Sequence, residues 1–196
     1  MSTSARNGAR SLAPLPVRAH PLVLGVVLFL ASELMFFAAL FAGYFELRAN
    51  RSAWPPPTVE LKPWEAAYGT FLLFAASVVM VFATKAMDRG KTRAARCWTF
   101  CAVVAATGFV LEALHGYAGD TFGISTNAYG SIYYAMTGFH LLHVIVGIAI
   151  LAALLIGMRS PALQVNQRAG AEAMTYYWHF VFIVWIGIFS TIYFVR

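Results

Sequence analysis

The hydrophobic pattern of the chain is a series of long apolar runs separated by short polar segments. Each of five runs has about the 20 residues that a helix needs to cross a hydrocarbon layer about 30 Å thick. The pattern therefore predicts an all-α polytopic membrane protein with five transmembrane helices. We expect a flexible basic tail over residues 1–20 and a bundle over 21–196, with helices at about 22–47, 66–87, 94–117, 128–158 and 171–195.

The composition supports a membrane protein. Of the 196 residues, 60% are hydrophobic and 11% are charged, and the mean hydropathy is +0.69. A soluble domain could not bury so much apolar surface. The net charge of +6 lies mainly in the loops and forms no basic face between aromatic residues, so no nucleic-acid partner is expected.

The distribution of cations predicts the orientation in the membrane. The N-terminal tail, the second loop and the fourth loop together hold 10 of the 14 Lys and Arg residues. Cytoplasmic loops carry the excess of such residues. We therefore expect a cytoplasmic N-terminus and, after five crossings, a C-terminus outside.

One carboxylic acid, Glu33, lies near the middle of the first apolar run. Charge at that depth is costly, so the acid should face protein, water or a specific partner. Desolvation also disfavours the charged form, and we expect a neutral acid that donates a hydrogen bond. An interhelical hydrogen bond and a site for protons or a ligand both fit this position.

The fourth and fifth runs contain three histidines, His140, His143 and His179. A haem or metal would need further ligands at the same depth, and only Glu33 qualifies. We therefore expect buried imidazoles that hydrogen-bond within the bundle, and no metal site. Cys97 and Cys101, four apart on one helix, are expected to be small core residues and not a redox pair.

Five sequence blocks, taken together, have a more specific meaning. They are SELMFF, WPP, AYGS, TGFHLLHV and YWHFV, at residues 32–37, 54–56, 128–131, 137–144 and 177–181. In this order they resemble subunit III of the haem-copper cytochrome c oxidases, over almost all of the chain from about residue 22. Longer family members have seven helices, and the chain resembles the shortened bacterial form that lacks the first two.

The resemblance implies a non-catalytic subunit of an enzyme that transfers electrons from cytochrome c to O2 and pumps protons across the bacterial plasma membrane. Subunits I and II would hold the haems and copper, and this chain none. It would pack on subunit I, bind phospholipid, and support proton uptake and durability in turnover. A respiratory supercomplex is a further candidate partner. Glu33 matches the family's intramembrane acid, and His140 and His143 match its histidine pair.

Two positions depart from the family pattern. Phe182 stands where the family commonly has Asp, and Glu112 with His115 replaces the usual Gln-x-x-Glu before a tyrosine. These changes affect any polar network carried over between the third and fifth helices.

Lipid contacts are expected on the first helix because the two missing helices would leave one of its faces uncovered. The candidates are Phe36, Phe37 and Phe41, with Arg159 at the end of the fourth helix as a headgroup partner.

Three alternatives remain at this stage. Within the superfamily, the chain could serve a quinol oxidase or act as an accessory subunit of a nitric oxide reductase. From another class, it could be a stand-alone transporter, although it has no inverted halves and no paired broken helices.

Overall fold

The computed structural model describes residues 21–159 and 167–195, and these residues form five helices joined by loops and turns. The helices are α1 (Pro21–Ala49), α2 (Pro63–Asp88), α3 (Thr92–Gly119), α4 (Ala128–Gly157) and α5 (Gln167–Tyr193). All five are long and apolar enough to cross a membrane, which confirms the predicted all-α fold. The predicted basic tail over residues 1–20 lies outside the described residues.

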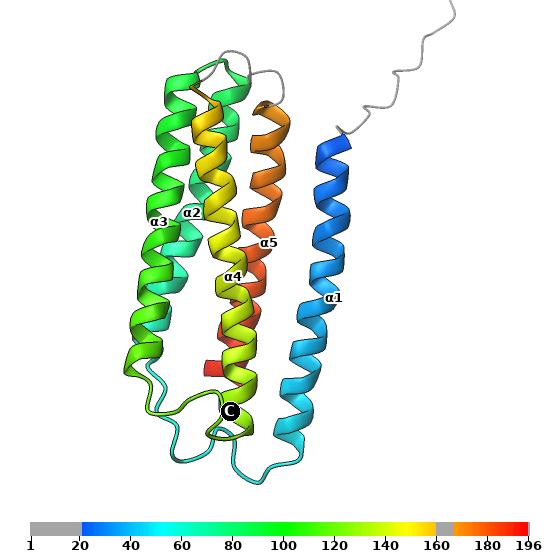
Figure 1. Ribbon diagram of the computed structural model, residues 1–196, viewed down its shortest axis with the longest axis vertical. Helices are drawn as coiled ribbons and strands as arrows, with labels where there is room; N and C mark the ends of the chain where they lie inside the picture. Colours follow the sequence, from blue (N-terminus) through cyan, green and yellow to red (C-terminus); the bar gives the residue numbers. More distant parts are fainter. Residues whose placement is uncertain (1–20, 160–166, 196) are drawn as a thin grey trace, which may run out of the picture.

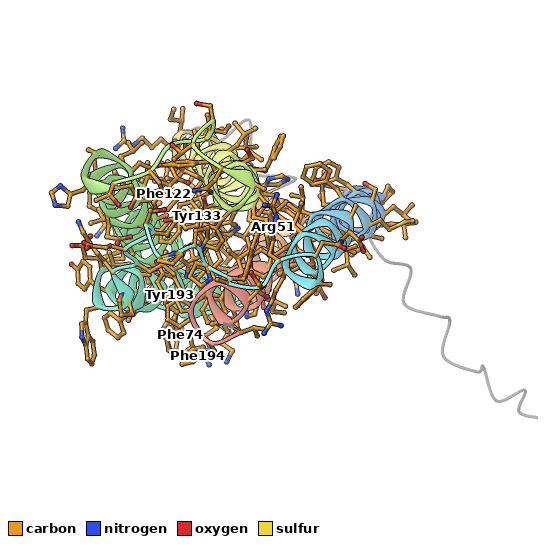
Figure 2. The ribbon with its side chains drawn as sticks, turned by 90° about the horizontal axis from the view of Figure 1, so that it is seen from below. Arg51, Phe74, Phe122, Tyr133, Tyr193 and Phe194 are labelled. Atoms are coloured by element: carbon orange, nitrogen blue, oxygen red, sulfur yellow. The ribbon has the colours of Figure 1, made fainter. Side chains whose placement is uncertain are left out.

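The helices run side by side as an up-and-down bundle, so that α1 begins at one end and α5 finishes at the other (Figure 1). α5 packs against α1, α2 and α4, and α2 packs most extensively against α3. Viewed from the end where α5 finishes, α1 lies to one side of the other four helices (Figure 2). The direction of the bundle across the membrane stays a prediction of the charge count.

The helix ends extend beyond several of the predicted ranges. α2 begins at Pro63, where a proline fits because the first turn has no intrahelical acceptor for its missing N–H. α5 begins at Gln167, four residues before the apolar run, and finishes at Tyr193. An apolar run marks only the part of a helix that meets hydrocarbon, and polar residues can continue the helix beyond it.

Close approach and a few polar contacts join the helices. A Cβ atom at Gly147 of α4 would lie 2.8 Å from Cε1 of Tyr177, so only glycine lets α4 approach α5 this closely. The Tyr44 hydroxyl of α1 donates to the Thr191 carbonyl, at 3.2 Å. Hydrogen bonds and small residues are the usual means of helix association in lipid, where apolar burial adds little driving force.

Cys97 and Cys101 are both exposed on α3, so the prediction that they are core residues is wrong. The reason is general to membrane helices. Lipid is as apolar as a protein core, and an apolar side chain therefore carries no information about whether it faces inward or outward.

Candidate functional site

Glu33 of α1 and His143 of α4 form a direct pair between two helices. Oε2 of Glu33 lies 2.9 Å from Nε2 of His143. The Glu33 side chain is 20% exposed and the His143 side chain 14%, so both are largely buried within the bundle but still accessible to a small ligand or proton donor. The expected hydrogen-bonding role of Glu33 thus has a specific partner on another helix.

The second nitrogen of His143 determines how protons are shared in this pair. Nδ1 lies 2.7 Å from the Phe139 carbonyl oxygen, which can only accept, so Nδ1 carries a proton. Nε2 then either accepts from a neutral Glu33 or, in a protonated imidazole, donates to a carboxylate. In both forms one proton lies between Glu33 and His143, and the pair has no net charge.

Neighbouring side chains fix the position of His143. The Tyr177 hydroxyl of α5 donates to the His143 carbonyl oxygen, at 2.7 Å. The ring of Phe37, which is 1% exposed, lies with its centroid 5.2 Å from that of His143. The pair therefore stands on a rigid apolar support built from three helices.

His140 faces the bundle interior and does not join the pair. It is 1% exposed and stacks on Trp185, with ring centroids 5.1 Å apart. Its ring also meets that of Phe109 in an edge-to-face contact, with centroids 5.8 Å apart. Neither ring nitrogen has a hydrogen-bond partner among the described side chains. The prediction of a buried imidazole is confirmed for His140, but the expected hydrogen bond is absent there.

His179 does not fit the prediction of a buried histidine. It is exposed on α5, and its Nδ1 donates back to the Thr175 carbonyl oxygen of the same helix, at 2.7 Å. The exposure of His179 could not be predicted from the sequence, because inward-facing and lipid-facing positions of α5 are both mainly apolar.

The aromatic residues expected to contact lipid divide into two groups. Phe36 is 37% exposed, and its ring meets that of Phe139 on α4 at a centroid distance of 5.0 Å. Phe37 is buried, and Phe41 packs within 3.0 Å of the position that a Gly187 Cβ would take. Lipid contact is therefore wrong for Phe37, because helix geometry turns neighbouring residues to different faces. For Phe41, which is partly buried, lipid contact stays a prediction.

The remaining predicted positions lie away from the pair. Arg159 is exposed just beyond the end of α4. Phe182 of α5 packs on Phe74 of α2, with ring centroids 5.5 Å apart, so an apolar contact stands at the position where the resemblance implies Asp. His115 is exposed, and Glu112 is half-buried near the end of α3.

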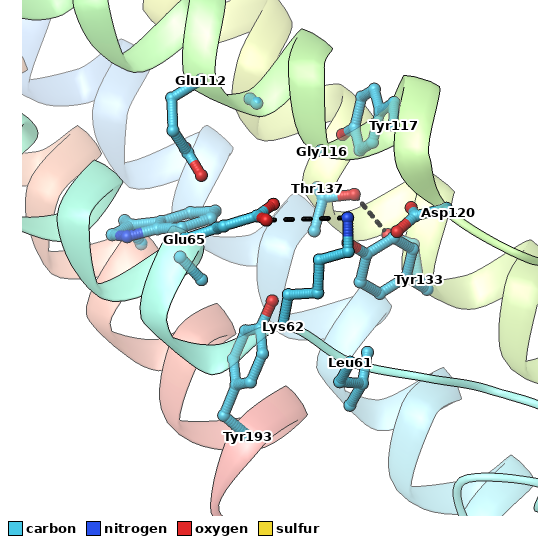
Figure 3. A pocket seen from close by; sticks show the side chains of 13 residues that line it. Leu61, Lys62, Glu65, Glu112, Gly116, Tyr117, Asp120, Tyr133, Thr137 and Tyr193 are labelled. Carbon is cyan, nitrogen blue, oxygen red and sulfur yellow. Dashed lines mark hydrogen bonds and ion pairs between the residues drawn. The ribbon is translucent and has the colours of Figure 1, made fainter.

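Glu112 borders a small polar pocket that sequence reasoning missed (Figure 3). The pocket has a volume of about 50 Å³ and lies between the ends of α2, α3, α4 and α5. Nζ of Lys62 is 3.6 Å from Oε1 of Glu65, and Asp120 also lines the pocket. Lys62 and Glu65 lie in one turn at the start of α2, but Glu112 and Asp120 come from a segment far along the sequence, so no local pattern predicts the pocket.

Metal ligation has no support in the part of the chain that the structure describes. There, no three His, Cys, Asp or Glu side chains come together as a metal ion would require. His140 and His143 point to different neighbours, and the carboxylate of Glu33 meets only the second of them.

Comparison with known proteins adds an independent line of information. The family described as "Cytochrome c oxidase subunit III" matches residues 13–196. The chain is 40% identical to "Probable cytochrome c oxidase subunit 3" of Nocardia farcinica and 38% identical to the protein of the same name from Mycobacterium tuberculosis. Each alignment covers 91% of this chain and 90% of the relative.

A more distant relative is longer than this chain. The "Cytochrome c oxidase subunit 3" of Pylaiella littoralis is 33% identical over 87% of this chain, but the alignment covers only 65% of that relative. The match over residues 13–196 includes all five helices and both members of the Glu33–His143 pair. This chain belongs to the cytochrome c oxidase subunit III family.

Proposed function

We propose that this chain is a non-redox subunit of a proton-pumping cytochrome c oxidase in a bacterial plasma membrane. In this proposal it packs on subunit I of a complex that also contains subunit II, and those two subunits hold the haems and copper. Family membership and five membrane-crossing helices support the proposal.

The Glu33–His143 pair is the observation that carries the proposal. A proton can move between the two side chains, 2.9 Å apart, without changing the net charge of the site. Such a neutral pair is far less costly in an apolar layer than a lone ion. The proton held between the two side chains can be exchanged with a neighbouring group, and this is how a chain without redox ligands would assist proton uptake.

The exposed face of α1 is the proposed contact surface for both subunit I and phospholipid. In the most apolar 18-residue stretch of α1, 17% of the residues are buried within the chain. In the corresponding stretch of α5 the share is 44%. Subunit I would cover part of this face, and phospholipid acyl chains would cover the part around Phe36 and Phe139. Arg159 is the proposed headgroup partner at the end of α4.

The other candidate functions are less well supported. The relatives at 38–40% identity are named for cytochrome c oxidase, and not for a quinol oxidase, a nitric oxide reductase or a transporter. A stand-alone transporter would purify as a lone oligomer, whereas an oxidase subunit should co-purify with haem-containing partners. A wider supercomplex would bring further respiratory proteins into the same fraction.

The decisive experiment removes this chain from the purified oxidase. We expect an unchanged haem spectrum and a preserved initial rate of O2 reduction, because the redox ligands lie in other subunits. We also expect fewer turnovers before inactivation, because slower proton delivery prolongs the lifetime of reactive intermediates at the O2-reducing centre. A lost haem spectrum would show that the chain helps to build the redox site. An unchanged number of turnovers would contradict the supporting role.

Elemental analysis tests the non-redox part of the proposal separately. The isolated chain should contain no stoichiometric iron, copper or zinc. A metal at one equivalent that survives exchange into a chelator-containing buffer would contradict this expectation.

A further inference from the structure

The turn between α2 and α3 carries a pocket that none of the functions above uses. Lys85, Arg89 and Lys91 line it, with Phe82 and Trp98, and its volume is about 410 Å³. The three cations are exposed, and the rings of Phe82 and Trp98 lie 5.3 Å apart with an interplanar angle of 34°. The pocket therefore has a cationic rim and an aromatic floor, at the end of two membrane-crossing helices.

The charge of this pocket is not balanced within the described chain. Asp88, the one carboxylate of the turn, is bonded to Arg168 of α5, with Oδ1 and Nε 2.8 Å apart. Within the described residues no carboxylate pairs with the three cations of the rim. α3 also begins beside the pocket, at Thr92, without a capping side chain. The partial positive charge of that helix end adds to the rim, so the pocket favours an anion.

An apolar groove between the same two helices lies nearer the other end of the bundle, and its residues on α3 continue the helical stripe that Ala94 and Trp98 of the pocket begin. Its volume is about 1080 Å³, and on α3 the small residues Cys101, Ala105 and Gly108 line it. The polar residues Glu65, Glu112 and His115 line only its far end, away from the cationic pocket. Leu72 of α2 forms the facing wall, since its Cδ1 would be 3.2 Å from a Cβ at Gly108. From Trp98 to Gly108 the helix rises about 15 Å, which is half of a hydrocarbon layer about 30 Å thick.

We propose that this pocket and groove bind one anionic phospholipid of the leaflet that faces the α2–α3 turn. The phosphate lies among Lys85, Arg89 and Lys91, and an acyl chain passes over Phe82 and Trp98 into the groove. Basic pockets between membrane helices are suited to anionic headgroups. The groove selects a lipid over a free phosphate or an acidic peptide, because neither of these would fill an apolar channel within the hydrocarbon layer. The proposal requires no redox partner and is separate from the lipid face of α1 and α4.

Binding can be measured on the full chain in mild detergent by native mass spectrometry. The probes are dioleoyl phosphatidylglycerol and the zwitterionic dioleoyl phosphatidylcholine, with inorganic phosphate as a competitor. We expect at least a ~10-fold preference for phosphatidylglycerol, because each cation near an anionic lipid increases its affinity about five-fold. Equal affinity for the two lipids, or full competition by equimolar phosphate, would overturn the proposal.

A matched pair of double variants locates the headgroup. Lys85→Gln with Arg89→Gln removes two rim charges and should weaken phosphatidylglycerol binding by about 10-fold or more. Arg93→Gln with Arg96→Gln removes two charges near the start of α3 that do not line the pocket, and should leave binding within about two-fold. All four positions are solvent-facing or half-exposed, and the helical content of each variant is checked by circular dichroism. Equal losses in the two variants would indicate non-specific charge attraction and overturn the pocket.

A second matched pair tests the acyl chain without changing any charge. Cys101→Phe fills the groove, whereas Cys97→Phe places the same side chain one turn away, at an exposed position that does not line the groove. We expect Cys101→Phe to weaken phosphatidylglycerol binding by several-fold and Cys97→Phe to leave it unchanged. Unaltered binding in Cys101→Phe would show that the lipid does not occupy the groove.

Discussion

Glu33 and His143 are 110 residues apart in the sequence, yet their side chains meet in a hydrogen bond of 2.9 Å. The contact joins α1, the most exposed helix, to α4. Because Nδ1 of His143 is committed to the Phe139 carbonyl, only Nε2 is available to Glu33. The intramembrane acid of this chain is therefore one half of a neutral pair.

The first prediction separates the hydrogen bond from the charge of Glu33. Glu33→Gln keeps the shape and can still donate to Nε2 of His143, so assembly with the oxidase should be nearly intact. Glu33→Ala leaves His143 without its partner and opens a cavity, at a cost of about 1–3 kcal/mol. Retention of the subunit on heating the purified complex measures both. Equal loss in the two variants would contradict a role through hydrogen bonding and packing.

The second prediction uses two neighbouring phenylalanines as controls for each other. Phe37→Ala removes a fully buried ring and should destabilise the chain by about 3–5 kcal/mol. Phe36→Ala removes an exposed ring and should have little effect on thermal unfolding but should reduce the phospholipid retained at the α1–α4 face. Phospholipid per complex and the unfolding temperature are both measured. A large loss of stability in Phe36→Ala would mean that this ring is part of the core.

The third prediction concerns Gly69 of α2 and Glu112 of α3. A Cβ at position 69 would collide with Oε2 of Glu112, so Gly69→Ala should displace the carboxylate and cost about 1–3 kcal/mol. Gly116→Ala is the control, because a Cβ there meets nothing within 4 Å.

Thermal unfolding in detergent measures these variants. Adding Glu112→Ala to Gly69→Ala should restore part of the lost stability, because the colliding oxygen is gone. No recovery in the double variant would show that the cost of Gly69→Ala arises elsewhere.

The fourth prediction is a pH dependence at Asp120, in the loop that follows α3. Burial raises the pKa of its carboxyl, and the hydroxyl of Tyr134 and the ammonium of Lys62 act in the opposite direction. A raised pKa in the folded state means that the contribution to stability is complete below the unfolded pKa of about 3.9. It is then lost as the pH rises through the folded value.

Asp120→Asn should remove this dependence. Relative to the unaltered chain, the unfolding temperature of the variant should increase as the pH is raised from 3.5 to 7. Glu60→Gln removes an exposed acid of the α1–α2 loop and controls for the change in net charge. A difference between Asp120→Asn and the unaltered chain that does not change with pH would contradict the prediction.

The sequence by itself determined the class of the protein, the five helices and the family. Each of these depends on local properties: the length of an apolar run, and short blocks such as TGFHLLHV that keep their order along the chain. It also identified Glu33, because a carboxylic acid within an apolar run is conspicuous without any knowledge of its neighbours.

Only the tertiary structure decided which residues meet. The apolar pattern could not tell that Phe37 is buried while Phe36 is exposed, or that Cys101 lines a groove, because lipid and protein interior are equally apolar. Likewise, the three histidines look alike in the sequence, but one pairs with Glu33, one is buried against Trp185, and one is exposed. These differences arise from the rotation of each helix about its axis. That rotation is determined by contacts between helices that are distant in the sequence.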